Sequence, residues 1–167
     1  MDRSGLLALY NYNAYANNVL LKAVAQLSHA EFIRKTSPSH NSVYELLIHM
    51  FEGEAFFLSA CKSHSLEASL NLPTLTSIHH VWTGLAEESN DFIASLADAD
   101  LAKEITIFIK DQPIYLSMWQ ALIQAFVHST HHRGELSIIL TQLGYPLPNL
   151  DILAHLIEQS GQQWPLK

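Results

Sequence analysis

The sequence has little cysteine and little basic charge. Its single cysteine, Cys61, excludes an internal disulfide framework and any zinc or iron–sulfur site built on several thiolates. Cys61 falls on the apolar repeat of an expected helix, which favours a buried, unreactive thiol.

Nine scattered Lys and Arg residues stand against 16 Asp and Glu, a formal charge of −7. Because the basic residues form no cluster of the kind that contacts a phosphate backbone, we expect no nucleic-acid partner.

The sequence also lacks a convincing membrane segment. The stretch 112–132 carries no formal charge, but it contains Pro113, several glutamines and three histidines. Such a composition is a poor match to the run of about 20 apolar residues that crosses a bilayer. The N-terminus has an acid at Asp2 and leads directly into an amphipathic helix, unlike a signal peptide. We therefore expect a cytoplasmic protein with no membrane partner.

Neither a Pro/Gly/Ser-rich linker nor an internal repeat divides the 167 residues, so we expect one domain over 1–167. Apolar side chains recur at helical spacing in four long segments. These are 4–27, 42–61, 76–96 and 117–144. The segments Ser42–Glu45 and Ser117–Gln120 are capping boxes that begin two of the helices. Gly144 is placed to end the last of them.

Two further elements complete the expected fold. Alternating apolar residues in 105–109 and 114–116 flank the turn-forming segment 110–113 and predict a short β-hairpin. A lone hairpin is marginally stable, so it must pack on the helices. Asn149 is placed to cap a short final helix that runs to about Gln159. The fold class is therefore all-α: a four-helix bundle with a small hairpin before the last long helix and a short C-terminal helix. Patterning alone leaves the connectivity of the bundle open.

Ten histidines are many for this length, and three of them suit a metal ion. His128 and His132 lie one turn apart on the fourth long helix, about 6 Å from each other, so both can face one ion. His49 lies beside apolar residues of the second helix and could meet the pair across the core. A single core-facing histidine is more often only hydrogen-bonded. A pair at this spacing strengthens the metal interpretation, because two buried neutral imidazoles are costly without a shared partner, but it leaves the hydrogen-bonded alternative open.

Competing sites can be rejected from the sequence. A zincin needs Glu after the first histidine of His-x-x-x-His, whereas position 129 is Ser129. A di-iron bundle needs Glu-x-x-His repeats, and none occurs here. A Ser–His–Asp hydrolase would need a nucleophile elbow, which is also absent.

Three motifs resemble those of the DinB/YfiT-like family of metal-binding four-helix bundles. The strongest is the segment 128–136, His-Ser-Thr-His-His-Arg-Gly-Glu-Leu, which continues to Leu-Gly-Tyr-Pro at 143–146. The others are Tyr-Asn-Ala-Tyr-Ala-Asn at 12–17, with Tyr15 in place of the usual Trp, and Leu-Leu-Ile-His-Met-Phe-Glu-Gly-Glu at 46–54. Glu135 replaces the common Gln. The motifs occur in family order and span nearly the whole chain.

The resemblance implies a right-handed bundle with up–down–down–up connectivity and three ligands, here His49, His128 and His132, which leaves His131 out. The ion would be divalent zinc, nickel or iron, among which imidazole does not select. Near the ion, Glu52 either accepts a hydrogen bond from a ligand histidine or is simply solvated. Asn13 and Asn17 are candidates for buried polar residues near the site. For the final motif, we expect Arg133 to pair with a neighbouring acid and Gly134 to allow close helix approach, in preference to a substrate role.

Two functions remain open at this stage. Three neutral imidazoles leave coordination positions free on a divalent ion, which suits metal-dependent hydrolysis or transfer of a small thiol, an activity known in one branch of the family. The alternative is a non-catalytic, stress-associated metal-binding protein whose ion supports the bundle or its dimer. An open, concave site would favour the enzyme, and a saturated, dry site would favour the structural role. Nothing in the sequence marks a particular substrate.

We expect the protein to form a homodimer. Charged residues make up 15% of the chain, against about 25% in typical domains, so more apolar surface is present than a small monomer conceals. The family resemblance also implies frequent homodimers. Light scattering at micromolar concentration should give twice the chain mass of 18.8 kDa. A mass of one chain would contradict this prediction.

Overall fold

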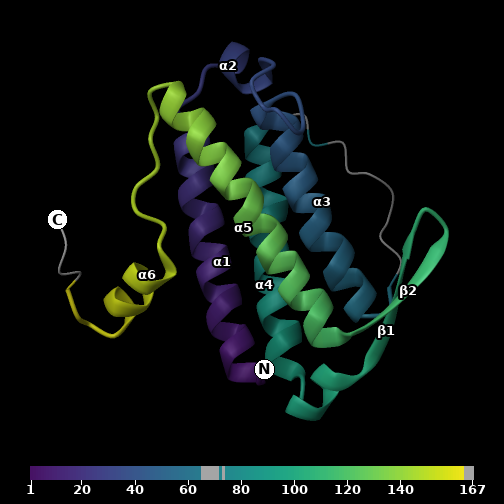
Figure 1. Cartoon of the computed structure of the whole chain (residues 1–167). Coiled ribbons are helices and arrows are strands. Elements are labelled where there is room, and N and C mark those ends of the chain that lie inside the picture. The colour runs from purple at the N-terminus through teal and green to yellow at the C-terminus, as the bar shows by residue number, and fades with distance from the viewer. Residues whose placement is uncertain (65–71, 73, 164–167) are drawn as a thin grey trace.

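The computed structural model describes residues 1–64, 72 and 74–163. Four long helices of this part stand side by side (Figure 1). They are α1 (Arg3–Val24), α3 (Val43–Cys61), α4 (Leu75–Ser95) and α5 (Met118–Gln142). Most of the expected connection between α3 and α4 lies outside the described residues. None of the described helices is long and apolar enough to cross a membrane.

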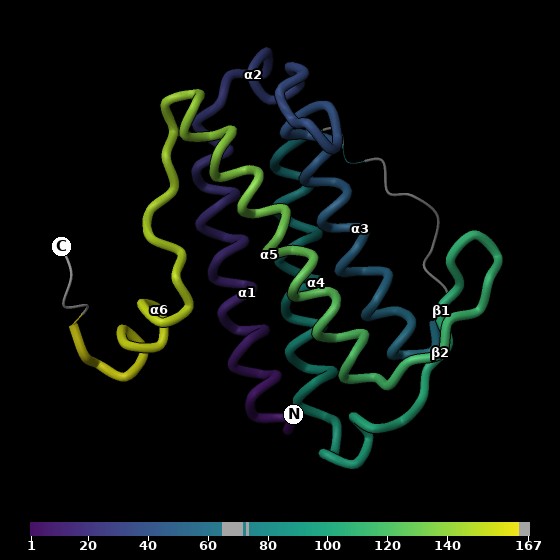
Figure 2. The backbone as a smooth tube through the Cα atoms, in the orientation of Figure 1, coloured from purple at the N-terminus to yellow at the C-terminus, as the bar shows by residue number. Residues whose placement is uncertain are grey.

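The order of the helices around the bundle differs from a simple up-and-down meander. α1 and α5 run in one direction and α3 and α4 in the other (Figure 2). α1 packs on α4 and α5, and α3 packs on the same two helices, so α1 and α3 lie diagonally opposite. The predicted all-α bundle is confirmed. Its connectivity is the up–down–down–up order that the family resemblance implied.

α3 and α5 begin where the capping motifs predicted, but the capping box expected at Ser42–Glu45 is formed only in part. The Ser42 side chain accepts the backbone N–H of Glu45, while the Glu45 carboxylate accepts from the Asn41 amide. At the start of α5, the backbone N–H of Ser117 donates to Gln120 Oε1 at 2.8 Å. Satisfying these N–H groups locally is what fixes both helix starts.

The first predicted helix was too long. α1 ends at Val24, and a separate short helix, α2 (His29–Ile33), follows it. Ser28 accepts the backbone N–H of Glu31, and the Glu31 carboxylate accepts from the backbone N–H of Ser28. This capping box starts a new helix where the apolar periodicity predicted only the end of the first.

The predicted hairpin is present and packs on the helices. It consists of β1 (Glu104–Ile109) and β2 (Gln112–Ser117), paired antiparallel, and follows the 3₁₀ helix η1 (Asp98–Ala102). Lys110 and Asp111 form its two-residue turn, and both have positive φ, 48° and 62°. Ile105 and Ile107 are buried among apolar residues of the helices. This packing supports the hairpin, which would be only marginally stable alone.

The final helix begins two residues later than predicted. α6 (Ile152–Gln159) is capped by Asp151, whose side chain accepts the backbone N–H of Leu153. Asn149 accepts the backbone N–H of Asp151 instead. Asn149 therefore shapes the turn before the helix.

The core has two apolar clusters with polar residues between them. One cluster includes Leu6 and Leu122, and the other includes Leu20 and Leu136. On α1, the buried Asn13 and Asn17 lie between the two sets along the helix. The same interruption occurs on α5, so the polar residues of several helices meet at one level of the bundle.

Candidate metal centre

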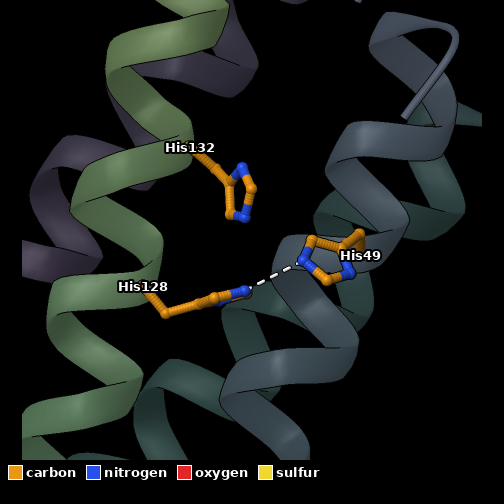
Figure 3. A group of neighbouring side chains, drawn as sticks. All are labelled: His49, His128 and His132. Carbon is orange, nitrogen blue, oxygen red and sulfur yellow. Dashed lines mark hydrogen bonds between the residues drawn. The ribbon is translucent and has the colours of Figure 1, made fainter. Parts of the chain in front are cut away.

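Three histidines from two helices meet on one side of the bundle. His128 and His132 extend from α5 and His49 extends from α3, and all three rings point toward one another (Figure 3). The ring centroids lie 4.6–4.8 Å apart. His128 Nε2 and His49 Nε2 are 2.9 Å apart, at hydrogen-bond distance. His132 is buried, whereas His49 and His128 are half-buried.

The donor set fits a divalent metal ion. One ring nitrogen from each histidine lies within 4.8 Å of the others. Imidazole nitrogens bind zinc at about 2.0–2.1 Å, which places two ligands of a tetrahedral ion roughly 3.4 Å apart. Small rotations of the rings would bring the nitrogens to that spacing. Among the described residues, the buried Nδ1 atoms of His128 and His132 have no hydrogen-bond partner. The three residues could therefore hold one ion.

The electrostatic surroundings keep the three imidazoles neutral. Burial, together with the neighbouring histidines, lowers the pKa of His49 to about 4. Burial is also the main cause that lowers the pKa of His128 and of His132. Groups whose pKa lies below the usual imidazole value are uncharged at pH 7. Their lone pairs are therefore available to a metal ion without the loss of a proton.

A glycine on α3 makes room for one of these rings. Gly53 lies one turn beyond His49 on α3. A Cβ atom at position 53 would lie 2.7 Å from Cε1 and 2.8 Å from Nδ1 of His128. No side chain fits there while the His128 ring keeps its place. The glycine is thus part of the site, although the sequence analysis did not single it out.

A buried polar network lies beside the histidines and connects the four long helices. Its centre is Glu54 of α3, which is 9% exposed. Oε1 of Glu54 accepts from the side-chain amides of Asn13 and Asn17 on α1, each at 3.0 Å, and from the Ser129 hydroxyl on α5. Oε2 accepts from Nε1 of Trp82 on α4 at 3.0 Å. Four donors therefore satisfy the carboxylate.

The opposite charge in this network is Arg133 of α5, which is 4% exposed. Its guanidinium donates to the Oδ1 atoms of Asn13 and Asn17, whose amides donate to Glu54. Burial lowers the pKa of Arg133, and the negative charge of Glu54 opposes that shift. The two asparagines thus join a buried cation to a buried anion.

A carboxylate on α5 connects the site to the loop before α3. Glu135 accepts from the Ser37 hydroxyl and from the hydroxyl of Ser39 at 2.6 Å. Its Oε2 lies 3.7 Å from His132 Nδ1. In the same loop, the ring of His40 is stacked on His49, with centroids 3.8 Å apart and planes inclined by 22°. The loop therefore covers one side of the three-histidine group.

Residues 1–163 match the sequence profile of the DinB family. The chain belongs to the DinB family. A solved structure, that of the DinB-like protein YjoA from Bacillus subtilis, is similar to it with a TM-score of 0.64 at 18% identity. The similarity covers 86% of this chain and 96% of that one, and at this identity it bears on the fold. A search of curated proteins gave no match.

Several predicted residues of this DinB protein lie where the sequence placed them. Asn13 and Asn17 are buried as expected, in contact with Glu54 and Arg133. His131 is exposed and stands outside the three-histidine group. The two asparagines were accessible to sequence reasoning because they lie on the core stripe of the first helix, whereas the exclusion of His131 was implied by the family resemblance.

Other expectations about this DinB protein need correction. Arg133 donates to the two asparagines and to Thr130, and the acid that balances its charge is Glu54, on another helix. Gly134 is not a close-approach position, since a Cβ there would meet nothing within 4 Å. Glu52 is half-buried and makes no side-chain hydrogen bond within the described part of the chain. The acid that the core uses is Glu54, two residues further on.

The lone cysteine is buried, as predicted. Cys61 is 5% exposed, at the end of α3. Burial raises the pKa of its thiol to about 12. A thiolate is therefore disfavoured at neutral pH, as expected of a buried thiol.

Replacing Gly53 by alanine should weaken metal binding without unfolding the bundle. The new methyl group would displace the His128 ring, and we expect a loss of affinity of at least about tenfold, as when other supporting groups of a metal site are removed. Helix propensity would offset part of any strain, since alanine in a helix interior is favoured over glycine by about 1 kcal/mol. Isothermal titration with Zn²⁺ measures the affinity, and urea unfolding measures the stability.

Gly134→Ala is the matched control, because α5 offers open space there. It should keep the wild-type zinc affinity and stabilise the fold slightly. Wild-type affinity in Gly53→Ala would show that His128 does not need its observed position to bind the metal.

Proposed function

We propose that this DinB protein holds one divalent ion through His49, His128 and His132 and acts on a small molecule at that ion. The observation that carries the proposal is the convergence of three neutral imidazoles, with one nitrogen of each within 4.8 Å of the others. Within the described residues, no cysteine or carboxylate joins this group. The ligand set is therefore incomplete for a tetrahedral ion.

The exposure of the ligands supports an open site. His49 and His128 are only half-buried, so solvent and small molecules can approach the ring edges. An ion held by three neutral ligands keeps its double positive charge, lowers the pKa of bound water to about 7 and can bind a thiolate directly. Both properties suit thiol transfer or hydrolysis. Because Cys61 is buried and protonated, a reacting thiol would have to come from the substrate.

Spectroscopy of the cobalt-substituted protein tests this function. The protein should be purified without a His tag or nickel resin, loaded with Co²⁺ and titrated with small thiols. A thiolate that enters an open position should produce a sulfur-to-cobalt charge-transfer absorption. Screens with thiols plus electrophiles, and with esters, should then show turnover that EDTA abolishes and added metal restores.

A different result would identify the non-catalytic role. If the protein binds the ion but neither thiols nor other small ligands alter the cobalt spectrum, the site is closed to substrates. Metal-dependent stabilisation without turnover would then make this a structural ion. If no ion is bound at all, the proposal is wrong.

A further inference from the structure

The loop before α3 is a closed turn built next to the three histidines. We define the strap as residues Ser37–His40. Asn41 ends the turn with a positive φ of 62°, and its carbonyl oxygen accepts the backbone N–H groups of Thr36 and Ser37 at 2.7 and 2.9 Å. The backbone N–H of His40 donates to the Ser37 hydroxyl at 3.0 Å. These bonds give the strap a defined shape, although it belongs to no helix or strand.

Glu135 fastens the strap to the helix that carries two of the candidate ligands. Its Oε1 accepts from the Ser37 hydroxyl and from the backbone N–H of Ser39, and its Oε2 accepts from the Ser39 hydroxyl. Three donors of the strap thus meet one carboxylate, which lies one turn from His132 on α5.

The same contacts fix the orientation of His40. Ser39 Oγ lies 2.7 Å from His40 Nδ1 and also donates its one proton to Glu135. A hydroxyl that has already donated can only accept from the ring. In this arrangement His40 Nδ1 donates to Ser39 Oγ, and the hydrogen bonds run in one direction from His40 through Ser39 to Glu135. The ring is held at a defined angle over its neighbours.

The position of His40 makes it a support for the ligands and not a fourth ligand. A metal ion lies close to the plane of each imidazole that binds it. The His40 ring is nearly parallel to His49, with centroids 3.8 Å apart, so one ion cannot lie in both ring planes. Toward His132 the ring stands nearly perpendicular, at 85° and 5.3 Å. His40 thus contacts one candidate ligand from each helix.

From these contacts we propose that His40 is a positioning residue, which holds His49 and His132 in place and covers one side of the metal. The inference rests on the proposed metal site and adds a group from outside the two ligand helices. The physical basis is that the rings of His49 and His132 pack against His40 before the ion binds. Less side-chain freedom is therefore lost on binding. An ion in such a site should leave slowly, because the ligands cannot rotate away one at a time.

Release of Co²⁺ to excess EDTA tests the role of the ring. We expect His40→Ala to release the ion about tenfold faster than wild type, within the range found for groups that orient metal ligands. His40→Phe keeps a flat ring without nitrogen and should release within about twofold of wild type. The visible cobalt spectrum should keep the same intensity in both variants, since the ligands are unchanged. His80→Ala, an exposed histidine on α4, is the control and should behave as wild type.

Each other outcome overturns a stated part of the proposal. Unchanged release in His40→Ala, in a protein that binds Co²⁺, overturns the positioning role alone. Fast release in His40→Phe together with an altered spectrum would make His40 a ligand. A wild-type protein that takes up no Co²⁺ overturns the proposed metal site, and the positioning role with it. Urea unfolding of the metal-free variants separates these results from a general loss of stability.

Discussion

Alanine at position 49, 128 or 132 is expected to remove most of the bound metal. Each substitution leaves two imidazoles on an ion that needs at least three protein ligands in an open site. The metal affinity should fall by more than about a hundredfold, because substitution of residues that only support the ligands of a metal site can already lower the affinity by that factor. Elemental analysis of His49→Ala, His128→Ala and His132→Ala, purified without nickel resin or a His tag, measures the metal retained per chain.

The control for this series is His131→Ala. His131 is adjacent to His132 on α5, but it is exposed and outside the three-histidine group, so its loss should leave the metal content unchanged. If His131→Ala lost the ion and His132→Ala kept it, the assignment on α5 would be wrong by one residue. Metal retained in all four variants would place the ion elsewhere.

Replacing Glu54 by glutamine is expected to destabilise the metal-free bundle by about 3–5 kcal/mol, because it removes one charge of a buried pair. Glutamine has nearly the same shape, but it leaves the buried Arg133 guanidinium uncompensated. It also turns one acceptor oxygen into an NH₂ group that faces the donors of Asn13, Asn17 and Ser129 or of Trp82. Urea unfolding in the presence of EDTA measures the change in the free energy of unfolding.

Glu52→Gln is the matched control, since the same change two residues earlier falls on a half-buried side chain outside the network. It should shift the stability by no more than about 0.5 kcal/mol. Arg133→Met should be destabilising by itself, and the double variant Glu54→Gln/Arg133→Met should lose less than the sum of the two. Additive losses would show that the two charges do not depend on each other.

Local chemistry explains which parts of this protein were predictable. The Ser42 hydroxyl accepts the backbone N–H of Glu45, and Gln120 accepts the backbone N–H of Ser117, so local hydrogen bonds begin α3 and α5 where the motifs indicated. The spacing of His128 and His132 is a property of one helix and was equally readable. At Ser28 two local signals competed, the capping box and the apolar periodicity of the preceding helix. The periodicity extended the predicted helix past Val24, so the start of α2 was not predicted.

By itself, the sequence determined the four long helices, the hairpin and the pairing of His128 with His132, because each depends on residues within a few positions of one another. The sequence also placed His49 on the apolar side of another helix, where it could meet the pair, and the family resemblance implied it as the third ligand. Only the tertiary structure decided that Glu54 balances Arg133, that Gly53 leaves room for the His128 ring, and that His40 stacks on His49. These relations join residues on different elements. They follow from the order of helices around the bundle and the rotation of each about its axis, which packing of the whole core sets.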